Sequence, residues 1–488
     1  MTNDIDSETE EASPHSEPHS NETHVDLAIL GGGPAGYAAA LYGASCGLNI
    51  AVVERNKVGG TCLHQGCVPA KELLETASIL RTCQSADEFG VMADRVPVLD
   101  MATMQQRKSG VIEQLHKGLS GLMKGRHISI VNGTGRLLPG KQLQVYTDTG
   151  EERVISAENI VLATGSAPRT LPNMEIDGNT IVTSDEVLNL DHIPTSVAVI
   201  GGGAIGCEFV SFFHDIGAQV TLLEALPRLL AGCDVDISNA LSRSFKKKGV
   251  KVHTGIQITG HEIHEKGVTL FFGDNESISV EMVVVAIGRR PVTEGILSGK
   301  TNVRVDERGF IVVNDSLQTT ADGVWAIGDV INTPQLAHVG FAEGIQVIKH
   351  ILGENPPPLQ YGKVPWGIYT HPEVAFAGMT EEQAKQSGYN VMVRKDPFGG
   401  NSRARVIGET DGMVKVVAES DADGHAGKIL GVHIVGPWAT ELLSPGYLAV
   451  NWEATPDDFA GLVQPHPTLS EAFGEVAIAL TGRSLHVA

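Results

Sequence analysis

A short glycine pattern constrains the fold of this chain more than any other feature. The stretch "VDLAILGGGPAGYAAALYGASCGLNIAVVE" begins with an apolar run at residues 25–30 and then places Gly31, Gly33 and Gly36 as G-x-G-x-x-G. A second apolar run follows and ends at Glu54. This order predicts a strand, a tight turn, a helix and a second parallel strand. The glycines permit a close approach of a pyrophosphate and the acid can bind a ribose hydroxyl. We therefore predict a dinucleotide site rather than an ordinary glycine-rich turn.

The same pattern returns later in the chain with the same spacing. "VAVIGGGAIGCEFVSFFHDIGAQVTLLE" places Gly201, Gly203 and Gly206 after an apolar run, and Glu224 stands 18 residues past the last glycine, as the acid does in the first copy. Two copies predict two Rossmann-like domains and two bound dinucleotides. A carboxylate at this position accepts from the ribose 2′-hydroxyl of NAD and repels the 2′-phosphate of NADP. We predict NAD for the second copy, although Arg228 lies nearby.

Each copy has a later apolar run that ends in a similar turn. "IVLATGSAPR" contains Thr164 and Gly165, and "VVVAIGRRP" contains Gly288. A third related stretch, "TTADGVWAIGDV", contains Gly328 and Asp329. These turns are expected to follow strands of the two dinucleotide-binding sheets, where ligands of such folds bind.

Two cysteines stand close together just after the first copy, in "GGTCLHQGCVPAKEL". Five residues of ideal helix rise about 7.5 Å, more than the roughly 7 Å over which two Cα atoms can be bridged. Cys62 and Cys67 can therefore form a disulfide only if the segment is bent, and Gly66 is the residue that permits a bend. A helix that starts near Pro69 would stabilise a Cys67 thiolate. From the residues alone, a redox pair, two unrelated thiols and a metal site remain open.

The segment "GGTCLHQGCVPAK" resembles the active-site signature of the pyridine nucleotide–disulfide oxidoreductases, and the resemblance extends from about Val25 to the C-terminus. Within that family the chain is most similar to the dihydrolipoamide dehydrogenases. It departs from their usual pattern at His64-Gln65 and at Ala70. The resemblance implies an α/β fold with two Rossmann-like domains and a C-terminal α+β dimerisation domain. The expected layout is an acidic disordered tail at 1–24, an FAD domain at 25–170 and 294–364, an NAD domain at 171–293 and an interface domain at 365–488.

The resemblance also assigns roles to single residues. Cys62 matches the thiol that exchanges with the substrate, and Cys67 matches the thiol next to the flavin. Lys71 and Glu208 match a pair beside the flavin at the nicotinamide face. The residues expected to bind FAD are Gly31, Gly33, Gly36, Glu54, Lys71, Gly135, Thr164, Gly165, Asp329 and Ala337, and those expected to bind NAD are Gly201, Gly203, Gly206, Glu224 and Gly288. No metal ligand set is expected.

The C-terminal segment "QPHPTLSEAFGE" matches the remaining active-site motif of the family through His466 and Glu471. A histidine oriented by a carboxylate is the usual general base. The resemblance implies that this pair reaches the cysteines of the other subunit of a homodimer. It implies oxidation of dihydrolipoyl groups of 2-oxoacid dehydrogenase complexes, with electrons passing through the cysteines and FAD to NAD⁺. The alternatives are a reductase of a small disulfide such as mycothiol disulfide, or a flavoprotein scaffold without turnover.

Composition narrows the partners and the compartment. The 488 residues carry 36 Lys and Arg against 58 Asp and Glu, a net charge of −22, which argues against nucleic acid or an anionic membrane surface as partner. No apolar run approaches the roughly 18 residues of a membrane helix. The first 24 residues are acidic and lack the pattern of a signal peptide. Sparse cysteines do not form a secreted disulfide framework, so we expect a cytoplasmic protein.

Overall fold

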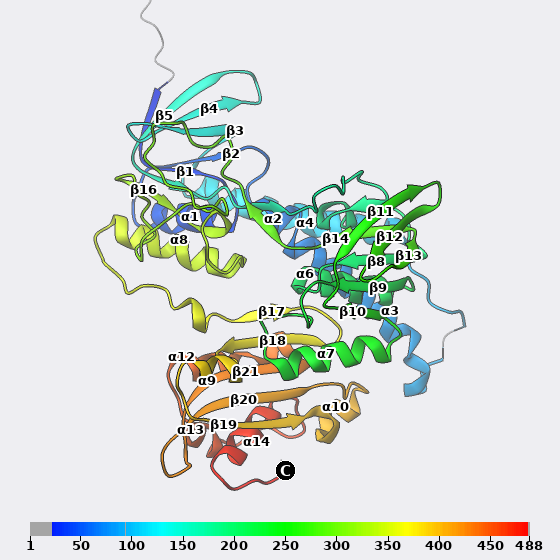
Figure 1. The fold of residues 1–488 in the computed structure, drawn as a ribbon. Helices are drawn as coiled ribbons and strands as arrows, with labels where there is room; N and C mark the ends of the chain where they lie inside the picture. Colours follow the sequence, from blue (N-terminus) through cyan, green and yellow to red (C-terminus); the bar gives the residue numbers. More distant parts are fainter. Residues whose placement is uncertain (1–21, 93, 487–488) are drawn as a thin grey trace, which may run out of the picture.

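The computed structural model describes residues 22–92 and 94–486. Figure 1 shows three packed parts, each built around one sheet. The described residues form the α/β fold with two dinucleotide-binding domains and a C-terminal α+β domain that the sequence predicts. The acidic tail lies outside them up to residue 21. No helix among them is long and apolar enough to cross a membrane.

The first sheet contains the first glycine pattern. Five strands run parallel in the order β3, β2, β1, β5, β16, and β4 lies antiparallel between β3 and β5. Helices α1 and α8 lie together on one side of it in Figure 1. The strands are β1 (Glu22–Leu30), β2 (Ile50–Glu54), β3 (Ser129–Leu138), β4 (Gln142–Thr147), β5 (Glu152–Leu162) and β16 (Val324–Ala326), and the helices are α1 (Pro34–Ser45) and α8 (Ala337–Ile351).

Strand β1 corrects the expected end of the tail. Glu22, Thr23 and His24 pair in parallel with Val154, Ile155 and Ser156 of β5, so the first domain starts at least three residues before position 25. The sequence of these residues is polar and carries no strand pattern. They form a strand because β5, more than 130 residues away in the sequence, extends past the apolar part of β1 and offers them backbone partners.

Two long helices connect β2 to β3 and carry the cysteine segment. A short helix α2 (Gly60–His64) leads into α3 (Cys67–Gln84), and α4 (Met101–Gly125) returns. Helix α3 buries Leu73, Ala77 and Leu80 in the same apolar cluster as Phe209 and Phe213 of the second part. The helix that begins at the second cysteine is thereby held between the first and second parts.

The second sheet contains the second glycine pattern and is parallel throughout, in the order β10, β9, β8, β14, β7. A three-stranded antiparallel sheet lies next to it, and β6 pairs with β15 where the chain enters and leaves this part. The elements are β6 (Ser166–Pro168), β7 (Ile181–Val182), α5 (Ser184–Val187), β8 (Ser196–Ile200), α6 (Ala204–Asp215), β9 (Gln219–Glu224), α7 (Val235–Lys247), β10 (Lys251–Thr254), β11 (Ile258–His264), β12 (Gly267–Phe272), β13 (Glu276–Val280), β14 (Met282–Val285) and β15 (Arg289–Pro291).

The third sheet is antiparallel, in the order β17, β18, β21, β20, β19. Helix α14 covers β19 and β20, and α7 of the second part packs against β21. Figure 1 shows α7 lying along this sheet. The elements are β17 (Trp366–Ile368), β18 (Glu373–Gly378), α9 (Glu381–Gln386), β19 (Val391–Pro397), α10 (Ser402–Val406), β20 (Met413–Ser420), β21 (Ala426–Gly436), α11 (Ala439–Leu442), α12 (Ser444–Asn451), α13 (Pro456–Ala460) and α14 (Glu471–Leu480).

Candidate active site

One cavity of about 1760 Å³ runs past both glycine turns and the cysteine segment. Sixteen of the site residues expected from the sequence line it. They include residues of the first glycine turn, the second glycine turn and the cysteine segment. Four expected residues lie outside its lining: Gly36, Gly206, His466 and Glu471. The fold thus places the two predicted nucleotide sites and the thiol pair along a single cavity.

The third glycine of each turn has a packing role. A Cβ on Gly36 would lie 1.9 Å from the carbonyl oxygen of Gly31, and a Cβ on Gly206 would lie 1.9 Å from that of Gly201. No carbon atom fits at that distance, so only glycine lets the helix start so close to the preceding strand. This closeness explains why these two glycines do not line the cavity although they shape it.

The residues at both turns fit a bound dinucleotide. Helices α1 and α6 begin after Gly33 and Gly203, and neither N-terminus receives a side-chain cap. The amide groups of their first turns, except that of Pro34, which has no hydrogen, are therefore available to a pyrophosphate. The Glu54 carboxylate accepts hydrogen bonds from the Gly32 amide at 2.7 Å and the Asn56 amide at 2.8 Å. Glu224 is held in the same way by the amides of Gly202 and Leu226, the second at 2.6 Å. Both carboxylates also line the cavity, where a ribose hydroxyl can reach them.

The cysteine segment is bent as disulfide formation requires. Cys62 lies on α2, Cys67 begins α3, and the helix is interrupted between them at Gln65 and Gly66. Gly66 adopts φ −155° and ψ −110°, and a Cβ there would lie 3.0 Å from the carbonyl oxygen of Thr61. Both cysteines are free thiols, and the Cys62 thiol donates a hydrogen bond to the Cys67 sulfur.

The two thiols are electrostatically unequal. The hydrogen bond from Cys62, together with the Lys71 ammonium, lowers the pKa of Cys67 to about 7, although desolvation by the surrounding residues opposes the charge. The same hydrogen bond and burial raise the pKa of Cys62. The reduced pair therefore keeps its negative charge on Cys67 and its proton on Cys62, which is the distribution expected of a thiolate at a helix N-terminus.

Lys71 and Glu208 meet across the boundary between the first and second parts. The Lys71 ammonium donates to both oxygens of the Glu208 carboxylate at 2.9 Å and lies 4.8 Å from the centre of the Tyr369 ring. The Tyr369 amide also donates to Glu208 at 2.9 Å. Burial opposes the charge on Lys71, but Glu208 outweighs it and the pKa of Lys71 is raised. The ion pair keeps a positive charge beside Cys67.

Three residues of this region were missed by the sequence reasoning. Tyr37 lies close enough to the cysteine pair that burial and the charges of both thiols raise its pKa to about 12. Tyr369 completes the contact with Lys71 and Glu208 described above. The fully buried Glu343 accepts from the Gly328 amide at 2.6 Å and the Tyr361 hydroxyl at 2.9 Å, and so holds the third glycine turn. Tyr37 follows directly after the first glycine pattern, which is the one signal in the sequence that could have indicated it.

The third glycine turn, which contains Gly328 and Asp329, is hydrogen-bonded to strands β6 and β15, where the chain passes between the first and second parts. The Ser166 hydroxyl donates to Asp329 at 2.5 Å and receives a hydrogen bond from the Arg289 guanidinium at 2.7 Å. Burial raises the pKa of Asp329. The hydroxyl of Thr164 donates to the carbonyl of Val292 at 2.6 Å. The β6–β15 link therefore sets the position of Asp329 on the cavity wall.

His466 and Glu471 are paired but lie away from the cysteines of the same chain. The Nδ1 atom of His466 lies 2.9 Å from Glu471 Oε2, and the histidine side chain is 68% exposed. Glu471 is the first residue of α14 in the third part. The contact leaves Nε2 as the ring nitrogen available to a substrate, and the exposure leaves that nitrogen open to a second molecule.

Comparison with known proteins agrees with this geometry. The profile described as pyridine nucleotide-disulphide oxidoreductase matches residues 25–344, and that of the dimerisation domain of the same family matches residues 364–477. A dihydrolipoyl dehydrogenase of Bacillus subtilis is 42% identical over 95% of this chain and 99% of its own length. One of Thermus scotoductus is 39% identical over 95% of this chain and 98% of its own length.

Two solved structures share the fold over almost all of the chain. LpdA of Mycobacterium tuberculosis has a TM-score of 0.86 at 25% identity, covering 94% of this chain and 99% of its own. The Cu(II) complex of the flavoprotein disulfide reductase RclA of Escherichia coli has a TM-score of 0.84 at 26% identity, covering 94% of this chain and all of its own. With both glycine turns, the thiol pair and the third domain in place, the chain belongs to the pyridine nucleotide–disulphide oxidoreductase family.

Proposed function

We propose that this protein is a dihydrolipoyl dehydrogenase, which oxidises dihydrolipoyl groups and passes the electrons to NAD⁺. The observation that carries the proposal is the unequal Cys62–Cys67 pair on the wall of a cavity that also holds two complete dinucleotide turns. Relatives that bear this name match nearly the whole chain at 36–42% identity. FAD at the first turn and NAD at the second supply the electron chemistry when bound.

The chain's own residues perform the thiol exchange. In the oxidised enzyme Cys62 and Cys67 form a disulfide, and a thiolate of the dihydrolipoyl group attacks the Cys62 sulfur. The S–S bond breaks, Cys67 leaves as a thiolate held by Lys71, and a mixed disulfide joins the substrate to Cys62. The second substrate thiol then attacks the substrate sulfur of the mixed disulfide, which closes the lipoyl disulfide and releases the Cys62 sulfur. That sulfur takes up the proton that the second thiol gives to His466. His466 accepts the substrate proton at Nε2, and Glu471 orients its ring through Nδ1.

The match to the family's dimerisation domain supports a homodimer. In the proposed enzyme His466 of the partner subunit completes each site, and this assignment is supported by its exposure and by its absence from the cavity of its own chain. The lipoyl group would come from a 2-oxoacid dehydrogenase complex. We place the enzyme in the cytoplasm, where a cysteine pair of this kind stays reducible. For the domains we propose the bounds 22–170 with 294–364, 171–293 and 365–488.

The test of the proposal is Cys62→Ser in the FAD-loaded enzyme. Oxidation of dihydrolipoamide should be abolished because the exchanging sulfur is gone, while reduction of an artificial acceptor by NADH should persist because it needs no thiol. Cys83→Ser, an exposed cysteine on the same helix as Cys67, is the matched control and should leave both activities intact.

Parallel assays with glutathione disulfide and mycothiol disulfide distinguish the substrate. If the enzyme reduces either disulfide with NADH faster than it reduces lipoamide, that disulfide and not the lipoyl group is its substrate. Normal dihydrolipoamide oxidation by Cys62→Ser would contradict the role of the thiol pair.

A further inference from the structure

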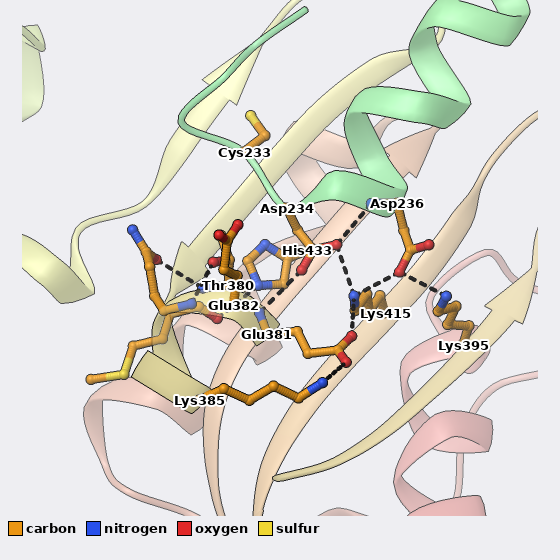
Figure 2. A network of polar contacts seen from close by, with 12 residues as sticks. Cys233, Asp234, Asp236, Thr380, Glu381, Glu382, Lys385, Lys395, Lys415 and His433 are labelled. Carbon is orange, nitrogen blue, oxygen red and sulfur yellow. Dashed lines mark hydrogen bonds and ion pairs between the residues drawn. The ribbon is translucent and has the colours of Figure 1, made fainter. Parts of the chain in front are cut away.

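A fully buried lysine lies where the second and third parts meet. Lys415 is on β20 and has no exposed side-chain surface. Its ammonium lies 2.8 Å from Asp234 Oδ1, 2.7 Å from Asp236 Oδ2 and 2.8 Å from Glu381 Oε2 (Figure 2). The two aspartates stand at the start of α7, in the second part, and the glutamate begins α9, in the third. Lys415 thus joins two domains through one charge.

The surrounding charges balance, but only one of the lysines is enclosed. Lys395 pairs with Asp236 at 2.7 Å and Lys385 pairs with Glu381 at 2.6 Å, and their side chains are 42% and 57% exposed. Three lysines therefore face three carboxylates, two of them from the rim of the cluster. Loss of a rim lysine exposes a carboxylate to water, whereas loss of Lys415 leaves the 1% exposed Asp234 without its cation.

Asp234 connects this cluster to the backbone on both sides. Besides Lys415, its Oδ1 accepts from the Asp236 amide at 3.0 Å, which caps α7, and its Oδ2 accepts from the Glu381 amide at 3.1 Å. The pKa of Asp234 is lowered because the hydrogen bond and charge of Lys415, together with the Asp236 amide, outweigh the effect of its burial. Asp234 therefore remains a carboxylate held from three directions, and displacement of any holder moves the start of α7.

The segment that ends at Asp234 begins at the second ribose-binding acid. Residues 225–233 connect Glu224 at the end of β9 to the start of α7. The Leu226 amide donates to Glu224 at 2.6 Å, and both residues line the cavity. The Leu230 amide donates to the carbonyl of Gly202, inside the second glycine turn, at 2.8 Å. One end of this segment thus forms the nucleotide site and the other end is anchored by Lys415.

We propose that Lys415, a residue of the dimerisation domain, is a positioning residue for the nicotinamide nucleotide. It fixes Asp234 and with it segment 225–233, so that Glu224 and Leu226 keep the geometry that receives the adenosine ribose. This inference rests on the proposed NAD site and adds a determinant of its affinity that touches neither cofactor nor substrate. The physical reason is that a buried carboxylate stripped of its cation must move toward water or take up a proton, and either change is passed along the short segment.

The test is Lys415→Met in the FAD-loaded dimer. Titration calorimetry with NAD⁺ should show a dissociation constant raised about fivefold or more, as for an ordinary coupling between two sites. The KM for NAD⁺ should rise in parallel while kcat at saturation stays within about twofold, because the reacting groups are unchanged. Hydrogen exchange should increase in residues 225–233 and stay unchanged in residues 31–36 of the first glycine turn.

Two kinds of variant isolate the role of the buried charge. Lys395→Met and Lys385→Met remove equal charges from the rim and should leave the dissociation constant of NAD⁺ unchanged. Lys415→Met combined with Asp234→Asn removes the stranded charge and should recover most of the lost affinity. If Lys415→Met does not fold, Glu381→Gln is measured in its place. This substitution removes one of the three carboxylates that hold Lys415, and because the Glu381 side chain is partly exposed, the variant should still fold.

The outcomes separate this inference from the proposed function. Wild-type enzyme that does not bind NAD⁺ would overturn the proposed function. Wild-type enzyme that binds NAD⁺, with Lys415→Met or its substitute Glu381→Gln showing the same dissociation constant and only a lower melting temperature, would overturn the positioning role. It would leave the cluster as a stabilising contact between domains.

Discussion

Cys67 and Lys71 lie one helical turn apart on α3, and their charges decide which thiol is reactive. The N-terminus of α3, the hydrogen bond from Cys62 and the Lys71 ammonium all favour a thiolate on Cys67. Glu208 opposes it, and holds Lys71 in place at the same time. Lys71 and Glu208 together therefore set the pKa of Cys67, and the packing of α3 against α6 keeps both charges in place.

Lys71→Met should raise the pKa of Cys67 above its value of about 7. The substitution removes a cation that favours the thiolate and leaves Glu208, which disfavours it. Thiolate is the form above the pKa, so it should now appear only at higher pH. The measurement is a pH titration of the long-wavelength absorbance of the two-electron-reduced, FAD-loaded enzyme. Lys57→Met, an exposed cation elsewhere on the cavity wall, should leave the midpoint unchanged, and an unchanged midpoint in Lys71→Met would exclude the electrostatic role.

The strand–turn–helix units show how closely an element is tied to its glycines. In both copies the helix starts against the carbonyl of the first glycine, and the following strand delivers an acid to the amide of the residue directly after that glycine. The first glycines adopt φ values of +109° and +111°, a conformation that costs other residues free energy. The two strand–turn–helix units therefore have the same local geometry, although each is expected to bind a different dinucleotide.

Gly206→Ala should abolish NAD binding without removing FAD. The added Cβ would lie 1.9 Å from the Gly201 carbonyl, so α6 must move away from β8 and the second turn opens. The first turn lies in a different sheet and is not affected. We expect a normal flavin content with loss of NADH-dependent turnover and of NAD⁺ binding by calorimetry. Gly110→Ala on α4, where a Cβ meets open space, is the control, and full NAD⁺ affinity in Gly206→Ala would refute the packing argument.

At the scale of the whole molecule, the dimerisation domain supports a homodimer, and in the proposed enzyme each chain contributes half of each of two active sites. The cavity of one chain contains the thiol pair but not His466, whose ring is exposed on the third domain. A two-fold arrangement places the same surface of both chains in contact. It brings each histidine to the other chain's cysteines in the proposed enzyme.

Mixed dimers test this arrangement. His466→Gln and Cys62→Ser should each be nearly inactive toward dihydrolipoamide as homodimers. After unfolding and remixing, about half of the dimers should be mixed and each should hold one intact site, so activity should approach roughly a quarter of wild type. Mass spectrometry verifies that mixed dimers form. Mixed dimers without activity would mean that His466 serves its own chain or is not the base.

Features that depend on neighbours in the chain could be predicted from the sequence. The two glycine turns and their acids follow from spacing, because a few adjacent residues decide the backbone there. For Cys62 and Cys67 the spacing indicated only that a disulfide requires a bend, which Gly66 permits. The family resemblance added the fold class, which the family profiles and the sheets confirm. It also added the domain layout, which stays a prediction. The roles assigned to single residues stay predictions.

Only the tertiary structure decided which distant groups meet. Lys71, Glu208 and Tyr369 are more than 130 residues apart in sequence, and their contact depends on α3 packing between domains. The strand that begins at Glu22 depends on β5, and the burial of Lys415 depends on three carboxylates from two other elements. A lysine in a strand sequence indicates an exposed position, because burial of its charge is favourable only where partners converge on it. That convergence is a property of the packed chain, and no local pattern encodes it.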